Sequence, residues 1–232
     1  MVEDKQAISR IISRSSARGW VLEPDAEHIM ALEGIPVPRY KVVTTHEEAV
    51  SAAREIGYPV VAKVVSPDVL HKTEVHGVEI GIDNDEKLIE AFNRFASIRG
   101  FTGMLIEEMV QGLELILGAQ RDVQFGPMIL LGMGGTGVEI YQDVALRMAP
   151  LKPSDVSSMV NSLKGHKLLE GYRGSEPVNM EKLTNVVLAF SGFIMDFEDS
   201  IESVDVNPLK CSSQDCVAVD TRIILSKKAQ AT

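Results

Sequence analysis

The sequence lacks both a hydrophobic run long enough to cross a membrane and a long run of basic residues. A spanning helix needs about 18 consecutive apolar residues or more, so the first absence argues against an integral membrane protein. With 23 basic and 33 acidic residues, the formal net charge is −10, which would repel nucleic-acid phosphates over most of the surface. Residues 1–20 lack the apolar core of a signal peptide, which argues against secretion.

Cysteine is also scarce, since only Cys211 and Cys216 occur, on either side of a short polar segment. The pair leaves two interpretations open, a disulfide or two free thiols in a reducing cytoplasm, and so few cysteines favour the second. We therefore expect a cytoplasmic protein. A thiolate metal site would need further Cys or His residues nearby in the sequence, and none is present there.

The rest of the composition is that of an ordinary globular protein, with 232 residues, 45% hydrophobic and 24% charged. This length allows one large domain or two small ones that share a cleft. We find neither an internal repeat nor a low-complexity segment. Helical and strand patterns both occur, and we expect an α+β fold of two lobes with a cleft between them.

Local patterns predict the elements of these lobes. Periodic apolar residues and capping signals predict helices over residues 4–18, 23–32, 45–56, 86–98, 153–163 and 180–197. Short apolar runs predict strands over residues 60–65, 75–82, 104–109, 113–120, 127–131, 138–140, 144–148, 201–207 and 216–224. Helix–strand alternation changes to consecutive strands at residues 100–103. We therefore expect an N-terminal helix in residues 1–22, a first lobe in residues 23–102 and a second in residues 103–232.

One lysine and one histidine stand out in the first lobe. Lys63 interrupts an apolar β-branched run, Val60–Val65, and a buried ammonium group is costly unless an anion meets it. Lys63 either reaches water from the strand edge or points at a nucleotide phosphate. His71 follows on a polar loop, and imidazole is a nucleophile and proton carrier near neutral pH. Together these residues suggest phosphate chemistry.

Acidic residues follow the strand that begins near residue 104. Glu107 and Glu108 end this apolar run, and Glu114 comes just after Gly112. Taken alone, adjacent carboxylates at a strand end are solvated. The alternative is that the backbone here meets an adenine edge while Glu114 accepts hydrogen bonds from ribose hydroxyls.

A glycine-rich segment, residues 132–137, follows another predicted strand. It lacks the terminal Lys-Ser/Thr of a P-loop and precedes a predicted strand rather than a helix, so neither the P-loop nor the Rossmann fingerprint applies. It is either a flexible hairpin or a loop whose backbone amides approach phosphates closely.

The C-terminal region offers ligands for a hard metal ion. Asp205 and Asn207 alternate with apolar residues and therefore share one face of a strand, which we expect Pro208 to end. If the following strand forms a hairpin with it, Asn207 and Asp220 converge. Mg²⁺ prefers such oxygen ligands together with substrate phosphates. Arg222, on the same face as Asp220, could reach the same phosphates.

Four segments together resemble ATP-grasp domains, and more narrowly the β subunits of ADP-forming acetyl-CoA synthetases (acetate–CoA ligases). They are residues 57–63, 66–74, 132–139 and 205–209. The Ser-Pro-Asp-x-x-His-Lys pattern is specific to this acyl-CoA synthetase family. The lysine strand and the Asn-Pro hairpin are shared with succinyl-CoA synthetase and other ATP-grasp ligases. Residues 134–139 depart from the pattern, because relatives often carry bulkier residues after the glycine pair.

The resemblance covers essentially the whole chain and implies an ATP-grasp fold, with a nucleotide between subdomain 1 in residues 23–102 and subdomain 2 in residues 103–232. It also implies roles for individual residues. His71 would relay a phosphoryl group, and Asn207 and Asp220 would bind Mg²⁺. The nucleotide, ATP or ADP, would be bound by Lys63 and Arg222 at the phosphates, by Glu107, Glu108, Met109 and Val110 at adenine, and by Glu114 at ribose.

The implied reaction is the reversible conversion of acyl-CoA, ADP and phosphate to carboxylic acid, ATP and CoA. A phosphoryl group would pass from a phosphohistidine of a CoA-binding α subunit through His71 to Mg·ADP, in an α₂β₂ assembly. This chain has no CoA-binding Rossmann pattern of its own. Two alternatives stay open at this point: a stand-alone ATP-grasp carboxylate ligase or kinase, and a non-catalytic nucleotide-binding regulator.

Overall fold

The computed structural model describes residues 2–135 and 142–230, so the strand expected at residues 138–140 lies outside the described residues. The chain forms two units. Unit 2 is the continuous segment Pro38–Val110, and unit 1 comprises Met1–Val37 and Gln111–Thr232. The boundary expected near residue 102 is wrong, because the strand after it pairs with two strands of unit 2. The N-terminal helix is likewise not separate, since its buried side chains belong to the core of unit 1.

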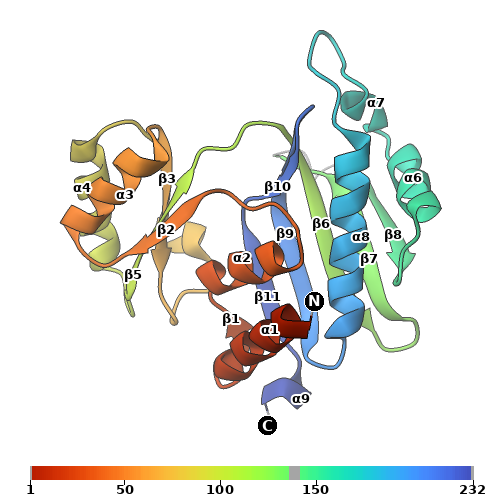
Figure 1. Ribbon diagram of the computed structural model, residues 1–232, viewed down its shortest axis with the longest axis horizontal. Helices are drawn as coiled ribbons and strands as arrows, with labels where there is room; N and C mark the ends of the chain where they lie inside the picture. The colour runs from red at the N-terminus through yellow and green to blue at the C-terminus, as the bar shows by residue number, and fades with distance from the viewer. Residues whose placement is uncertain (1, 136–141, 231–232) are drawn as a thin grey trace. The chain divides into compact units, whose positions relative to one another are not determined.

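Unit 2 is a four-stranded antiparallel sheet with two helices on one face (Figure 1). The helices begin at good capping residues, since Thr45 and Asn84 each accept a hydrogen bond from the backbone three residues later. The helices and alternate strand residues enclose an apolar core. The strands, in sheet order, are β2 (Tyr40–Val43), β5 (Gly103–Glu108), β3 (Val60–Val65) and β4 (Val78–Ile82), and the helices are α3 (His46–Ile56), α4 (Asp85–Ala96) and the short 3₁₀ helix η1 (Lys72–Val75).

Unit 1 is a seven-stranded sheet, in which neighbouring strands run antiparallel. Its path is β1 (Trp20–Val21), β11 (Thr221–Leu225), β9 (Ile201–Cys211), β6 (Leu113–Asp122), β7 (Gly126–Met133) and β8 (Val144–Met148), with β10 (Cys216–Ala218) paired to β9. Its helices are α1 (Val2–Ser15), α2 (Glu23–Leu32), α6 (Pro153–Ser162), α7 (His166–Leu169), α8 (Met180–Asp196) and α9 (Lys227–Gln230).

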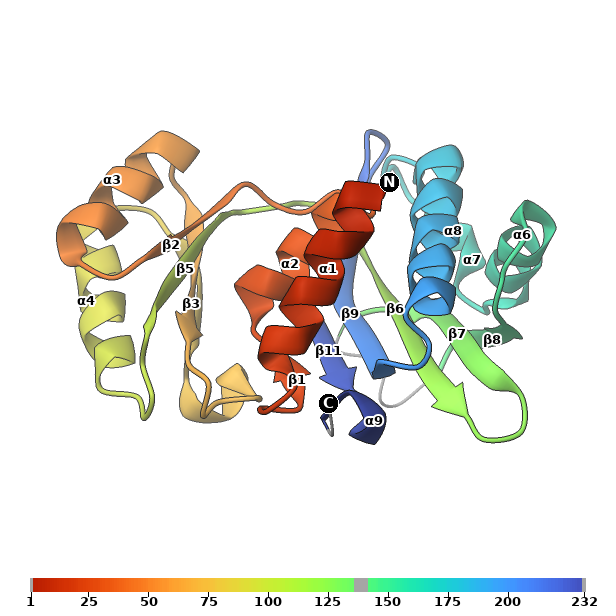
Figure 2. The same cartoon turned by 60° about the horizontal axis from the view of Figure 1, so that its bottom comes forward.

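The larger helices of unit 1 gather on one face of its sheet. Figures 1 and 2 show α1, α2, α6 and α8 on the same side of β9, β6 and β7. Their apolar side chains interdigitate with those of the strands in one large core. The opposite face of β6, β7 and β8 keeps partly exposed apolar residues, among them Val144, Leu146 and Met148. This face holds the candidate site of unit 1.

Several elements differ locally from the sequence-based expectation. Strand β4 begins at Val78 rather than Val75, because residues 72–75 form η1. Strand β9 continues through Pro208, whose carbonyl accepts a hydrogen bond from the Val219 amide. Proline is tolerated there because the β6–β9 register shifts beside it, so no donor is needed. The strand expected over residues 216–224 is two strands, β10 and β11, and α7 was not predicted.

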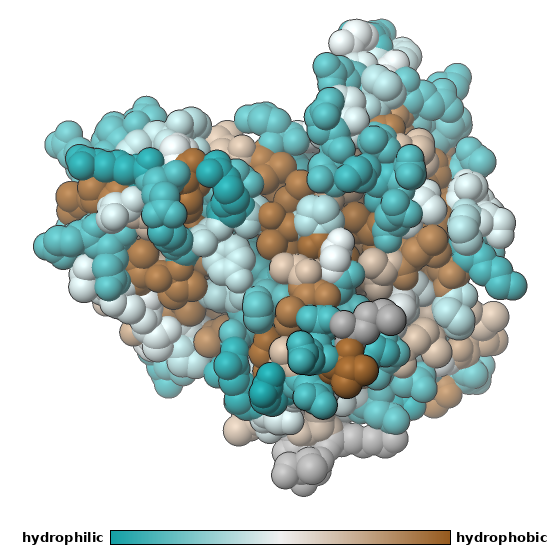
Figure 3. All heavy atoms as spheres, in the orientation of Figure 1, coloured by the Kyte–Doolittle hydropathy of each residue, from teal (hydrophilic) through white to brown (hydrophobic). Residues whose placement is uncertain are grey.

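The two cysteines lie directly opposite one another in the β9–β10 hairpin, and both are buried with free thiols. The Cys216 side chain and burial both raise the pKa of the Cys211 thiol. Hydrophilic residues are spread over the face drawn in Figure 3, with hydrophobic residues between them. Within residues 2–135 and 142–230, none of the helices has the length and apolar character that a membrane crossing requires.

Candidate functional site

Lys63 lies in the middle of β3 and forms an ion pair with Glu107 of the neighbouring strand β5. The distance from Lys63 Nζ to Glu107 Oε2 is 2.7 Å, and the two side chains are only 4% and 0% exposed. The register explains the pairing, because Lys63 stands opposite Leu105 and Val61 opposite Glu107, so the two charged residues are diagonal neighbours on one face. The lysine therefore does not reach water from a strand edge. A counterion from the neighbouring strand meets it, on the face of the sheet opposite the apolar core of unit 2.

His71 is exposed on the loop that joins β3 to β4, immediately before η1. The loop begins at the end of β3, the same strand that carries Lys63. Its return is fixed by Gly77, whose amide donates to the Lys72 carbonyl at 2.7 Å and whose carbonyl accepts from the Val64 amide at 2.8 Å. The structure thus presents the imidazole from an ordered turn at the edge of the unit 2 sheet.

Residues 107–110, which we expect to hold adenine, do not all have the same contacts. Glu108 is engaged with Arg39: its carboxylate accepts from the Arg39 amide at 3.0 Å and from Arg39 Nε at 2.7 Å. Its own amide donates to the Arg39 carbonyl at 2.9 Å. Met109 and Val110 follow the end of β5 as irregular backbone. These last two residues are therefore better candidates for backbone contacts with a base than Glu108.

Glu114 begins the site on unit 1. It stands directly opposite Lys210 in the β6–β9 pairing, and the distance from Lys210 Nζ to Glu114 Oε1 is 2.7 Å. The Gly134 amide donates to the Glu114 carbonyl at 2.7 Å. A Cβ at position 134 would lie 2.7 Å from that backbone, so only glycine allows this approach. The start of the glycine-rich segment is thus pinned to β6; residues 136 and 137 lie outside the described part of the chain.

Asp143, which follows residues 136–141, is also hydrogen-bonded to unit 1. The Asp143 carboxylate accepts hydrogen bonds from the Lys164 and Gly165 amides, both at 2.7 Å. The Asp143 carbonyl accepts from the Met133 amide at 3.0 Å. The described residues before and after residues 136–141 are therefore both hydrogen-bonded to other parts of unit 1.

Asn207 and Asp220 are neighbours through their backbones, because the Asn207 backbone amide donates to the Asp220 backbone carbonyl at 3.0 Å. Asn207 is exposed and Asp220 is half-buried, at the break between β10 and β11. An amide oxygen and a carboxylate are the hard oxygen donors that Mg²⁺ takes, so the donor set fits this ion.

Asp205 and Arg222 form a second pair beside these residues. They are cross-strand partners in the β9–β11 register, with 3.4 Å between Arg222 Nη2 and Asp205 Oδ2. Burial raises the pKa of the Asp205 carboxyl above its ordinary value of 3.8, against the opposing effect of the Arg222 guanidinium. A carboxylate held at such a cost of desolvation is typical of functional sites.

Asp205 and Arg222 line a groove of about 720 Å³ on the open face of the unit 1 sheet. Its floor is apolar, with Met128, Leu130 and Leu146 from β7 and β8. Its rim carries charged side chains, so the groove combines apolar contact area with sites for an anionic group.

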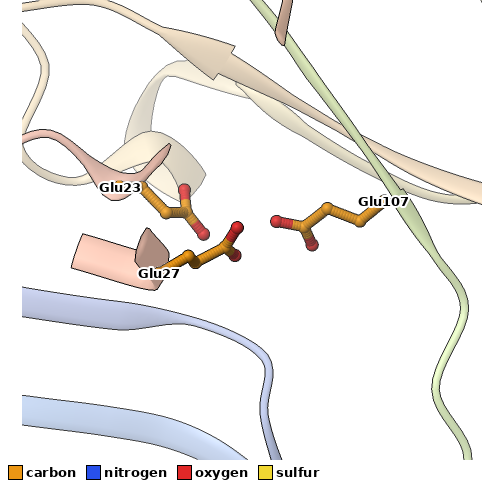
Figure 4. A group of neighbouring side chains, drawn as sticks. All are labelled: Glu23, Glu27 and Glu107. Atoms are coloured by element: carbon orange, nitrogen blue, oxygen red, sulfur yellow. The ribbon is translucent and has the colours of Figure 1, made fainter. Parts of the chain in front are cut away.

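The predicted residues thus fall into two sets, each described within its own unit. Unit 2 contains Lys63, His71 and residues 107–110; unit 1 contains Glu114, Asn207, Asp220 and Arg222. Sequence reasoning missed Lys210 and Arg39, because their partners are distant in sequence and only the strand register brings them together. It also missed two buried acids on α2, Glu23 and Glu27, which lie one turn apart on one helix face (Figure 4). Glu107 of unit 2 is drawn in the same figure.

Comparison with known proteins adds independent information. A family model described as ATP-grasp domain matches residues 13–225. The chain is 40% identical over 232 residues to the β subunit of ADP-forming acetate–CoA ligase I from Pyrococcus furiosus, with 96% of this chain and 100% of that one covered. It is 35% identical over 234 residues to ADP-forming acetate–CoA ligase I of Archaeoglobus fulgidus, covering 98% of this chain but only 34% of that protein.

A solved structure is also similar. It is the dinucleotide forming acetyl-coenzyme A synthetase 1 of Ca. Korarchaeum cryptofilum with coenzyme A and Mg-AMPPCP, whose phosphohistidine segment points towards the nucleotide binding site. The TM-score is 0.83 at 35% identity, and the match covers 94% of this chain and 100% of that one.

Proposed function

This chain belongs to the ATP-grasp family and, within it, to the β subunits of ADP-forming acetate–CoA ligases, and we propose that it transfers a phosphoryl group between His71 and a magnesium-bound adenine nucleotide. In the direction of ATP synthesis, the acceptor is ADP. The observation that carries this proposal is the buried Lys63, paired with Glu107, in the same strand that leads into the His71 loop.

The buried lysine supports a phosphate-binding role on physical grounds. An ion pair with both side chains out of water contributes little net stability, because desolvation offsets most of the attraction. Such a pair is more readily explained by a ligand that uses the charge. Glu107 keeps Lys63 charged and oriented, and nucleotide phosphates bring further negative charge to the same ammonium group.

The chemical step at His71 is a displacement at phosphorus. In the reverse direction, a neutral imidazole nitrogen of His71 attacks the γ-phosphorus of ATP and forms an N–P bond. The bond from that phosphorus to the β,γ-bridging oxygen breaks, and ADP leaves with the electron pair. The proton on the other ring nitrogen then passes to water. Imidazole suits this task because it is nucleophilic near neutral pH and phosphohistidine readily returns its group.

Residues of unit 1 hold the other parts of the nucleotide in this proposal. Asn207 and Asp220 bind Mg²⁺, which supplies charge neutralisation at the phosphates when it is bound. Glu114 meets the ribose, and Lys210 holds its carboxylate in place at 2.7 Å. Arg222 neutralises charge on the transferring group, with Asp205 as its partner while no phosphate is present.

The partner is a CoA-binding α subunit, and the A. fulgidus relative supports this part of the proposal. That single chain carries the name of the whole ligase, and this chain covers 34% of it. In this proposal, the CoA-binding part corresponds to the remaining two thirds of that ligase. An α₂β₂ assembly is the stoichiometry we propose, and sedimentation of the reconstituted complex measures it.

The test is phosphoryl labelling of the purified chain with ATP labelled at the γ-position and Mg²⁺. We expect acid-labile, base-stable label on His71 and none on His71→Ala. The matched control is His76→Ala, since His76 is exposed on the same loop five residues later. Equal labelling of wild type and His71→Ala would overturn the assignment, whereas loss of label in both variants would point to a general disturbance of the loop.

A further inference from the structure

The loop that carries His71 is hydrogen-bonded to another turn of unit 2 by side chains that have no part in the proposed chemistry. We propose that Ser66 and Asp68 are positioning residues that fix the His71 imidazole for phosphoryl transfer, an inference that rests on the proposed function of His71. These hydrogen bonds join the loop to the turn that follows α4, more than thirty residues later.

Ser66 makes the central hydrogen bonds between this loop and the turn after α4. Its side chain is buried, with the residue 3% exposed. Its hydroxyl donates to the Arg99 carbonyl at 2.8 Å and accepts from the Asp68 amide at 3.1 Å. One small side chain therefore uses its donor and an acceptor at once, which fixes both the loop and the turn beside it.

Asp68 adds a second connection between the same two segments. Its carboxylate accepts from Arg99 Nε at 3.1 Å. The Arg99 side chain is 90% exposed, so this ion pair alone contributes little. The ion pair matters for geometry, because it closes a ring with the Ser66 hydrogen bonds and restricts the Asp68 backbone.

The turn is shaped to receive these two residues. Gly100 has φ of +69°, and a Cβ there would lie 2.8 Å from both Ser66 Oγ and Asp68 Oδ2. Any other residue would be strained in this conformation and would also push the loop away. The Thr102 hydroxyl and amide both donate to the Val65 carbonyl, at 3.0 and 2.9 Å, and so hold the end of β3 against the same turn.

The other end of the loop is fixed by close packing. A Cβ at Gly77 would lie 2.4 Å from Val64 Cγ1, so the loop returns directly against β3. His71 thus lies between two fastened points, Ser66–Asp68 and Gly77. A nucleophile held this way loses less freedom when it attacks, and effective concentration in such transfers depends strongly on position. If these contacts were lost, the His71 loop would be more mobile. We expect phosphoryl transfer to be slower and nucleotide binding to be unaffected.

The test compares Ser66→Ala and Asp68→Ala with the wild-type chain in the γ-labelling reaction. We expect the rate at saturating Mg·ATP to fall roughly tenfold or more for Ser66→Ala and less for Asp68→Ala, with the Kd for ATP unchanged. Unlike Asp68→Ala, Asp68→Asn keeps a side-chain oxygen that accepts from Arg99, and we expect it to label at nearly the wild-type rate. The matched control is Ser97→Ala, which removes a hydroxyl that donates to the Arg94 carbonyl outside the loop.

Amide exchange in the same proteins gives a second, independent readout. We expect the amides of residues 69–76 to exchange roughly tenfold faster in Ser66→Ala, with the β3 and β5 amides unchanged. A uniform rise across unit 2 would instead show a purely structural role and overturn the positioning assignment. Wild-type labelling rates in both alanine variants would also overturn it. Wild-type chain without label on His71 would overturn the proposed relay itself, and with it the need to position the imidazole.

Discussion

Lys63 Nζ on β3 and Glu107 Oε2 on β5 lie 2.7 Å apart, and both side chains of this ion pair are removed from water. Removal of one partner leaves a buried charge without compensation, which costs about 3–5 kcal/mol. We therefore expect Lys63→Ala to lower the free energy of unfolding of unit 2 by that amount. Native-state hydrogen exchange of the β3 and β5 amides measures it.

The chain offers a matched control in the exposed pair Lys41–Glu55 of the same unit. Lys41→Ala should cost no more than about 1 kcal/mol, because exposed pairs are screened by water. The double variant Lys63→Met/Glu107→Leu should be more stable than Lys63→Ala, since neither charge remains buried. Equal losses for Lys63→Ala and Lys41→Ala would contradict the burial of the pair.

The pKa of Asp205 predicts a specific pH dependence in unit 1. Because burial raises this pKa above 3.8, the folded state holds the proton more tightly than the unfolded state. The stability contribution is therefore present at low pH and is lost as the pH rises through the folded pKa. Asp205→Asn removes this dependence, so we expect its stability relative to wild type to be greater at about pH 7 than at about pH 4.

Trp20 provides the measurement, because it is the only tryptophan of the sequence and pairs with Ile224 at the edge of the unit 1 sheet. Its fluorescence during denaturation reports unit 1. Glu202→Gln, an exposed acid on the same strand, serves as control and should show no such pH dependence. A constant difference between Asp205→Asn and wild type across this pH range would contradict the prediction.

The contact between Gly134 and Glu114 predicts an asymmetry between two glycines of unit 1. Gly134→Ala places a methyl group 2.7 Å from the Glu114 backbone, so we expect a loss of about 1–3 kcal/mol from overpacking. A Cβ at Gly192 on α8 would meet no atom within 4 Å outside its own helix backbone and chain neighbours, and replacement by Ala should add about 0.5–1 kcal/mol through helix propensity. Both changes are measured by denaturation followed at Trp20, and a stabilising Gly134→Ala would refute the close approach.

The magnesium assignment predicts a shift in metal requirement. Asp220→Ala should raise the Mg²⁺ concentration for half-maximal labelling of His71 by about tenfold or more, because one of two protein ligands is lost. The same titration on Glu202→Ala, which removes an exposed carboxylate from β9, should match wild type. An unchanged requirement in Asp220→Ala would exclude this residue as a ligand.

Much of the fold follows from local sequence patterns, and its class, α+β and ATP-grasp, is confirmed. Strands β3 and β8 and helix α2 have the predicted bounds, because short apolar runs and a Glu-Pro-Asp start are strong local signals. Local signals did not reveal that β5 completes the sheet of unit 2, since its pairing with β2 and β3 joins residues far apart in sequence.

In the candidate site, too, local sequence signals predict some features, while others depend on strand pairing between distant residues. The sequence indicates Lys63, His71 and the Asn207–Asp220 pairing through residue type, strand alternation and the hairpin. The partner of each charged residue is a matter of register, so the links from Lys63 to Glu107 and from Lys210 to Glu114 become visible only in the structure. The continuation of β9 through Pro208 depends on a register shift that no local rule anticipates.

The pairing of Trp20 with Ile224 has a consequence for synthesis on the ribosome. Unit 2 is a continuous segment, so it can fold as soon as Val110 has emerged. Helices α1 and α2 by then have no sheet to cover, because the strands they pack on are translated later. The N-terminal part of unit 1 therefore waits, with its apolar side chains uncovered, until the C-terminal strands arrive. We therefore expect a chaperone that acts on nascent chains to bind the uncovered apolar side chains of α1 and α2.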